Sequence, residues 1–219
     1  MSFARVATIT VWFSLMQLFA LAVHAQTASN PGVNAQLLVA VRMSDYEGVK
    51  KSLERGAAPN SRNRLGKTAL FIAIEKKRFD IAKLMLDSGA DANLASLEKV
   101  TPLIAAAYSG NTEIVGLLLT RKPKLEEVDR VHKSALIYAA GMGHVDIVSQ
   151  LLDAGAKIDA AYANALTPLM WASGQGHVEC VKLLRDRGAS LELKDDRGLT
   201  ALDIARDNKF LEITSLLKS

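Results

Sequence analysis

Histidine and cysteine are the residues of this chain best suited to acid–base, nucleophilic or metal chemistry, and they are few. Beyond residue 25 they are His132, His144, His177 and Cys180. Their spacing does not match that of a Cys/His metal site. The sequence also lacks a glycine-rich phosphate loop, a nucleophile elbow and a paired-carboxylate motif. We therefore expect no enzyme activity, no metal and no cofactor.

These four residues have structural interpretations. His144 and His177 each follow a glycine and occupy the same place in two successive segments of the chain, so we interpret them as residues that begin a helix. We expect His132 to be a solvated loop residue beside Lys133. Cys180 has no second cysteine with which to form an intramolecular disulfide, and we expect a small, buried apolar residue.

The spacing of the two histidines belongs to a period of 33 residues. A three-residue motif, consisting of a hydroxyl residue, then alanine or proline, then leucine, recurs at that interval along most of the chain. It begins at Thr68, Thr101, Ser134, Thr167 and Thr200. A fixed period of this length indicates a stack of similar supersecondary units.

Each copy of this motif predicts the start of a helix, because threonine and serine cap helix N-termini and proline suits the first helical position. A glycine break follows about ten residues after the cap. A second apolar run then begins, as at Ile114, Leu117 and Leu118, with the spacing of a helix that buries one stripe. Gly-Ala pairs such as Gly89-Ala90 predict where this second helix ends.

A 33-residue unit that opens on Thr-Pro-Leu, breaks at glycine and ends on Gly-Ala resembles the ankyrin repeat, and the likeness covers residues 34–219. It implies an all-α ankyrin-repeat solenoid of about six helix-turn-helix units, with projecting turns or short hairpins. The units are expected to start near residues 34, 63, 96, 129, 162 and 195. Two departures stand out. The family's histidine after Thr-Pro-Leu is absent throughout, so apolar packing must replace its hydrogen bond. Lys122-Pro123 replaces Gly-Ala in the third unit, where we expect a different helix end and a displaced turn.

In proteins of this family, the turn tips and the exposed side of the first helix contact other macromolecules. The resemblance therefore implies a protein partner bound through the turn tips and the concave helix face, by a chain that is itself a monomer. The candidate binding residues are Arg64, Lys67, Lys76, Tyr108, Arg130, Lys133, Met142 and Gln175. The first tips are basic and would steer an acidic partner. Trp171, four residues after Thr167, is expected in the core.

The N-terminus predicts export. Arg5, an uncharged run from Val6 to Val23 and small residues up to Ala25 are typical of a signal peptide comprising residues 1–25 and cleaved after Ala25. Residues 26–33 are then a flexible leader. These features predict a periplasmic or secreted protein without stable membrane contact once the signal is removed. The alternative is an uncleaved N-terminal anchor that leaves the repeats facing the periplasm.

The net charge and the family resemblance limit the classes of function to be considered. The formal net charge is +4, and loss of residues 1–25 removes only Arg5, leaving 4 − 1 = +3. An excess this small does not predict nucleic-acid binding. Exported ankyrin proteins of similar layout are linked to catalase and peroxide resistance, or are immunity proteins that mask lipase-type toxins. The sequence leaves both alternatives open. An enzyme grafted on the scaffold is a remote third.

Overall fold

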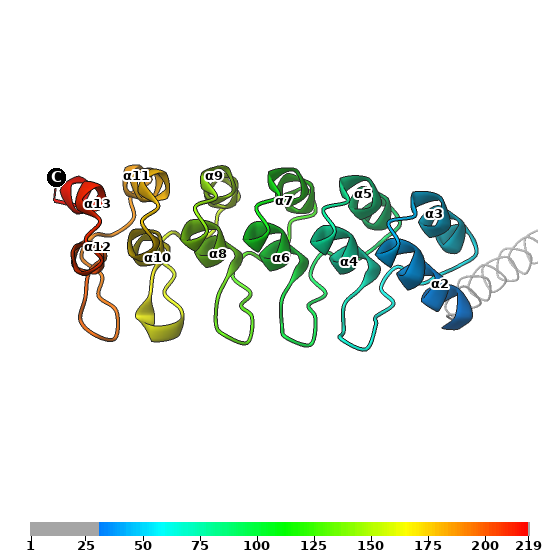
Figure 1. Cartoon of the computed structure of the whole chain (residues 1–219). Coiled ribbons are helices and arrows are strands. Elements are labelled where there is room, and N and C mark those ends of the chain that lie inside the picture. Colours follow the sequence, from blue (N-terminus) through cyan, green and yellow to red (C-terminus); the bar gives the residue numbers. More distant parts are fainter. Residues whose placement is uncertain (1–30, 219) are drawn as a thin grey trace, which may run out of the picture.

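The computed structural model describes residues 31–218, which form one row of paired helices (Figure 1). Units one to three contain α2 (Pro31–Arg42) and α3 (Tyr46–Glu54), α4 (Ala69–Glu75) and α5 (Phe79–Asp87), and α6 (Pro102–Tyr108) and α7 (Thr112–Leu119). Units four to six contain α8 (Ala135–Gly141) and α9 (Val145–Asp153), α10 (Pro168–Gln175) and α11 (Val178–Asp186), and α12 (Ala201–Asp207) and α13 (Leu211–Leu216). The predicted all-α architecture is confirmed.

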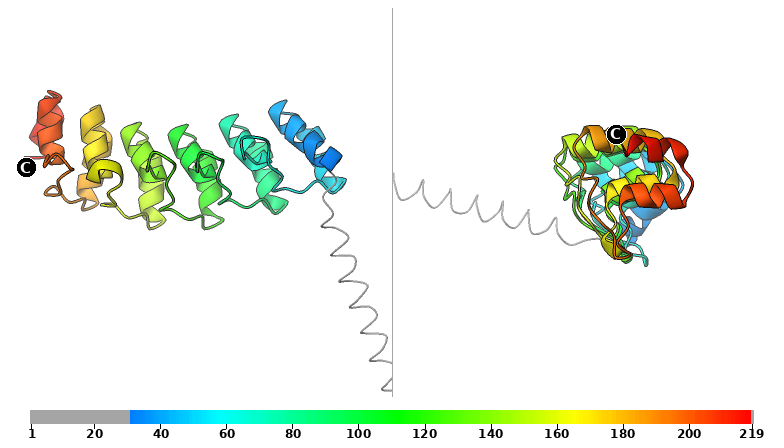
Figure 2. Two further views of the ribbon diagram at one scale, coloured as in Figure 1. Left: turned by 90° about the horizontal axis from the view of Figure 1, so that it is seen from below. Right: turned by 90° about the vertical axis from the view of Figure 1, so that its left-hand side faces the viewer.

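The helices lie in two layers, with hairpin loops projecting from one edge. In Figure 1 the first helix of units two to six lies between the second helix and the loop that hangs below. First helices pack against first helices of the next unit, and second helices against second helices. Figure 2, viewed along the row, shows the units superposed with their loops on the same side. Units two to six therefore each contribute one helix and one loop to a continuous face.

The helix starts follow the predicted caps. The amide of the residue three positions after each cap donates to the cap hydroxyl, as Phe71 does to Thr68 Oγ1 at 3.2 Å. Ile104 and Thr101 form the same bond at 3.2 Å, and Ile137 and Ser134 form it at 3.3 Å. The cap hydroxyl thus satisfies an amide that has no partner within the helix.

Alanine at one position of every first helix lets neighbouring first helices approach closely. Ala73, Ala106, Ala139, Ala172 and Ala205 are all completely buried. Five of the six positions that lack the family's histidine hold large apolar side chains, and four of these are buried: Phe71, Ile104, Ile137 and Met170. Apolar packing therefore takes the place of that histidine in units two to five.

The hairpin loops are closed and linked by backbone hydrogen bonds. In each loop one amide donates to the carbonyl four residues later, from Asn63 to Lys67 at 3.0 Å and from Ser96 to Val100 at 2.9 Å, for example. Successive loops are joined as well, because the Leu97 amide donates to the Leu65 carbonyl at 3.1 Å. An isolated antiparallel bridge pairs Arg62 with Thr68.

The loop of the fifth unit has a different form. Its tip is the short 3₁₀ helix η1 (Ala163–Ala165), and Asn164 and Ala165 both have positive φ angles, 62° and 56°. The Tyr162 hydroxyl donates to Glu126 Oε2, in the turn that follows α7, at 2.6 Å.

A second ladder runs through the turns that follow the second helices. A side-chain oxygen of one unit accepts from a backbone amide of the next, 31 residues later. The pairs are Asn60 with Asp91 (2.9 Å), Asn93 with Lys124 (2.8 Å), Glu126 with Lys157 (3.0 Å) and Asp159 with Ser190 (3.0 Å). This ladder fixes the register of consecutive units at the turns after the second helices.

Two predictions about local structure are wrong. The leader expected over residues 26–33 overlaps α2, which begins at Pro31, and Val33 is buried there. The third-unit turn is not displaced. Lys122 adopts the left-handed conformation (φ 49°) that Gly89 has in the second unit (φ 87°), and the Lys124 amide keeps its ladder bond. The tertiary contacts of this turn outweigh the cost of placing a side chain at positive φ.

The expected signal peptide, residues 1–25, and residues 26–30 of the expected leader lie outside the described residues. Within residues 31–218, every helix is too short to cross a membrane.

Candidate functional site

A groove of about 470 Å³ lies between the hairpin loops and the first helices of units two, three and four. The term "groove" refers below to this site. Its lining is mainly apolar and aromatic, with three carboxylates and one lysine. It comprises Lys67, Phe71, Glu75, Ser96, Glu98, Val100, Ile104, Ala105, Tyr108, Ser109, Asp129 and Tyr138.

Two tyrosines from adjacent units meet at one end of the groove. The ring centroids of Tyr108 and Tyr138 are 5.3 Å apart and the ring planes are at 82°, an edge-to-face contact. Tyr108 is 53% exposed, so part of its surface remains available to a partner. Tyr138 is held from below, because its hydroxyl donates to Asp129 Oδ2 at 2.6 Å.

Asp129 organises the loop that carries it. This residue is only 5% exposed, and its Oδ1 accepts from the amides of Val131 and Lys133, both at 3.0 Å. Burial, the hydrogen bond to Asp129 and the nearby carboxylate charge raise the pKa of Tyr138 above its ordinary value. Tyr138 therefore stays a neutral hydrogen-bond donor across the physiological pH range, and the Asp129 loop stays anchored to α8.

Two lysines lie against the aromatic rings. Lys67 Nζ is 2.6 Å from Glu75 Oε1 and 5.3 Å from the Phe71 ring centroid. Lys133 Nζ is 4.1 Å from the ring centroid of Trp171 and 5.4 Å from that of Tyr138. Both arrangements are cation–π contacts.

The prediction that Trp171 belongs to the core is wrong. Its side chain is half-buried, and one ring face carries the Lys133 ammonium. Its ring packs over Gly141 of α8, where Cε3 is 3.5 Å from the position that an added Cβ would take, and the ring remains partly accessible.

The structure brings some of the predicted binding residues together. Lys67 and Tyr108 line the groove, and Lys133 contacts its Tyr138 ring. Arg64 and Arg130 are exposed on its flanking loops, where Arg130 Nη1 is 3.5 Å from Glu98 Oε2. Lys76 is exposed and directly follows the groove residue Glu75.

Met142 and Gln175 lie apart from the groove. They are exposed at the ends of α8 and α10, in the fourth and fifth units. They share one register position of the repeat, but neither lines the groove.

Sequence reasoning missed Tyr138, Asp129 and Phe71 as groove residues. The sequence does contain a signal for Tyr138. It lies four residues after the cap of its helix, and the predicted binding residue Tyr108 lies seven residues after the cap of the neighbouring first helix. Positions three apart share a helix face. Phe71 could not have been found this way, because its residue exposure is only 2% and its ring forms the floor.

The chemically capable residues lie elsewhere and have structural partners. His144 Nε2 is 3.3 Å from the Tyr108 carbonyl, and His177 Nε2 is 3.0 Å from the Gly141 carbonyl. Cys180 is fully buried, and its burial, together with nearby Glu179, raises the pKa of its thiol to about 11. Among residues 31–218, no three His, Cys, Asp or Glu side chains are grouped closely enough to hold a metal ion.

Comparison with known proteins agrees with the geometry. The family model described as "Ankyrin repeats (3 copies)" matches residues 37–129, 80–162 and 136–219. The crystal structure of EF0377, an ankyrin repeat protein, is similar at a TM-score of 0.80 and 34% sequence identity, over 84% of this chain and 96% of that one. Comparison with curated proteins gives no match. Ankyrin repeats form a scaffold for protein–protein interaction. The matched segments together cover nearly the whole row of helix pairs, and the chain belongs to the ankyrin-repeat family.

Proposed function

We propose that this chain is an exported, non-catalytic binding module that holds a protein partner in the groove and on the neighbouring loop tips. The observation that carries the proposal is the exposed ring of Tyr108, held edge-to-face against Tyr138 in an open groove. Rigid aromatic side chains with large accessible area are typical centres of protein interfaces.

The loop tips beside the groove support the same use. Leu65, Leu97 and Val131 are 60%, 56% and 55% exposed, on three successive loops. The loops are joined by the bonds from the Leu97 amide to the Leu65 carbonyl and from the Arg130 amide to the Glu98 carbonyl, both 3.1 Å. Exposed apolar side chains on a pre-ordered surface lose little conformational entropy when a partner covers them.

The proposal of export is supported by the N-terminal sequence, with Arg5, the uncharged run and Ala25. The test is the mass and N-terminal sequence of the protein purified from cells. A chain that starts at Gln26 and is found in the periplasm or medium supports a cleaved signal. A full-length chain in the membrane fraction supports the anchored alternative, and a full-length chain in the cytoplasm rejects export.

The binding function is tested by capture from an envelope extract. The purified chain and a Tyr108→Ala, Leu97→Ala variant are immobilised separately, and retained proteins are identified by mass spectrometry. A protein held by the native chain and lost by the variant supports the proposal. The matched control is Asp207→Ala, which lies at the register position of Tyr108 in the last unit.

The outcome also separates the two roles suggested by resemblance. A retained catalase favours a role in peroxide resistance, and a retained lipase-type toxin favours immunity. Lack of any protein that distinguishes the native chain from the groove variant would reject the proposed function.

A further inference from the structure

We propose that the groove binds an acidic segment of the partner protein, with a bulky apolar side chain of that segment inserted beside Tyr108. This inference rests on the proposed function, because it specifies the chemistry of the bound protein. It is argued from the charges around the groove and from its lining.

Lys67 and Arg130 pair with carboxylates at the groove, but four further cations around it have no carboxylate partner within residues 31–218. Arg64, Lys76, Lys99 and Lys133 each lie on a groove-flanking loop or helix end, and no described carboxylate oxygen is within 4.0 Å of their charged nitrogens. Four cations gathered on one face produce a positive potential that attracts carboxylates.

The carboxylates of the groove, in contrast, are already engaged. Glu75 pairs with Lys67 at 2.6 Å, and Glu98 lies 3.5 Å from Arg130. Asp129 accepts hydrogen bonds from two backbone amides and from the Tyr138 hydroxyl. Charges that remain for a partner to neutralise are therefore positive, and the complementary segment is acidic.

The lining of the groove defines the second feature of the segment. Phe71, Val100, Ile104 and the exposed face of Tyr108 surround a space of about 470 Å³. That volume falls in the range of about 300–1,000 Å³ found for sites that take compact organic groups. A leucine or aromatic side chain would bury its apolar surface here, while the flanking carboxylates of the same segment reach the cations on the rim. This arrangement is an apolar interface centre with a charged rim.

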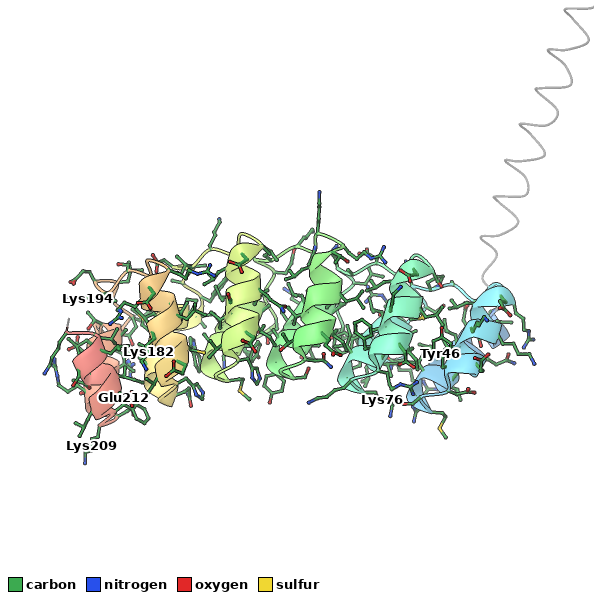
Figure 3. All side chains as sticks on the ribbon, turned by 90° about the horizontal axis from the view of Figure 1, so that it is seen from above. Tyr46, Lys76, Lys182, Lys194, Lys209 and Glu212 are labelled. Atoms are coloured by element: carbon green, nitrogen blue, oxygen red, sulfur yellow. The ribbon has the colours of Figure 1, made fainter. Side chains whose placement is uncertain are left out.

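The chain offers matched controls for both features. Tyr108 and Asp207 occupy the same repeat position, in the third and last units. Lys76 and Lys209 are both exposed residues that follow a first helix, and Figure 3 shows them near the same edge of the stack at opposite ends. A charge reversal at Lys209 thus changes the net charge as much as one at Lys76, but far from the groove.

The experiment is an unbiased selection of random linear peptides displayed on phage against the immobilised full chain. We expect enrichment of peptides with one aromatic or leucine residue flanked by aspartate or glutamate. For a selected peptide, Tyr108→Ala should weaken binding about tenfold or more. Lys76→Glu should slow association about threefold or more at low salt, an effect that high salt removes. Asp207→Ala and Lys209→Glu should leave both quantities unchanged.

Several results would overturn this inference. These are enrichment of basic peptides, absence of enrichment over the Tyr108→Ala chain, or equal effects of the groove variants and their controls. Random-sequence duplex DNA that displaces the selected peptides would identify a nucleic acid as the occupant instead. The proposed function fails separately, when no captured protein is lost by the Tyr108→Ala, Leu97→Ala variant. A captured protein that this variant loses, but that binds Lys76→Glu as fast and as tightly as it binds the native chain, would refute the acidic-segment chemistry while leaving binding in the groove intact.

Discussion

At the scale of single residues, the buried polar side chains differ in whether their hydrogen-bonding groups have partners. Ser52 and Ser173 are both buried serines in helices, 5% and 0% exposed. Ser52 Oγ donates to the Gly48 carbonyl at 2.7 Å, whereas Ser173 Oγ has no hydrogen-bond partner within residues 31–218. Units three and four hold Ala107 and Ala140 at the position of Ser173.

Replacement of Ser173 by alanine should therefore stabilise the protein. The substitution removes a buried hydroxyl that gained no hydrogen bond on folding, so we expect the free energy of unfolding to rise by about 1 kcal/mol. Urea denaturation measures the change. Ser52→Ala is the control, since it removes a satisfied hydroxyl and should be neutral or destabilising. A Ser173→Ala protein less stable than the native one would show that the hydroxyl has a partner.

Tyr162 predicts a pH dependence of stability. Burial, followed by the hydrogen bond to Glu126, raises its pKa from 10.0 to about 12. Because the folded pKa lies above the unfolded one, this contribution is complete below pH 10 and is lost as the pH rises from 10 through 12. We expect the free energy of unfolding to fall over this interval, and to fall less in Tyr162→Phe. In a pH titration followed by tyrosinate absorbance, the ionisation step near pH 12 should be absent from Tyr162→Phe. If the step near pH 12 is still present in the variant, it belongs to another tyrosine.

At the scale of elements, the units are joined through the start of each second helix. The His177 ring lies over Gly143 of the preceding unit, where an added Cβ would approach Nδ1 to 2.7 Å. Since a carbonyl only accepts, His177 Nε2 carries the proton that it donates to Gly141. His144 makes the same contact with Gly110 and Tyr108, and Arg78 donates from the equivalent position to the Ser44 carbonyl. At Gly110 and Gly143 this close approach requires glycine, whereas the left-handed backbone alone does not, since Ser44 and Lys77 adopt it at the equivalent positions.

We expect His177→Ala to destabilise the interface between units four and five. The change removes one hydrogen bond and the ring packed on Gly143, a loss of about 0.5–1.5 kcal/mol. Chemical denaturation of the purified protein checks it. His132→Ala, at an exposed loop tip, is the matched control and should change stability by less than about 0.5 kcal/mol. Equal effects of the two substitutions would mean that the ring contributes nothing to the stack.

At the scale of the whole molecule, stability depends on each unit covering its neighbours, because no pair of short helices buries enough surface alone. The core runs without a break from Val33 in the first unit to Leu217 in the last. The side-chain ladder and the bonds between loops repeat along the row as well. A defect in the middle should therefore affect the cooperativity of unfolding as well as its free energy.

Leu136→Ala tests this in the fourth unit. Leu136 is 4% exposed, and its truncation leaves a cavity that should lower the free energy of unfolding by ~2–5 kcal/mol. We also expect a broader denaturation curve, or two transitions, as units one to three and units five to six uncouple. A change of only a few tenths of a kcal/mol, with a single sharp transition, would contradict the assigned register.

The 33-residue period, the cap residues and the buried alanine position were readable from the chain, because they depend on local spacing and each is repeated several times. The turn of the third unit keeps its register although Lys122 replaces glycine there, and the sequence predicted otherwise. Contacts with the adjacent unit determine the backbone of this turn, and not the conformational preference of Lys122. The groove could not be read in this way. Tyr138, Asp129 and Phe71 come from two separate units, and Trp171 from yet another. Only the stacking of units determines which of their side chains meet, which are covered and which charges remain without a partner.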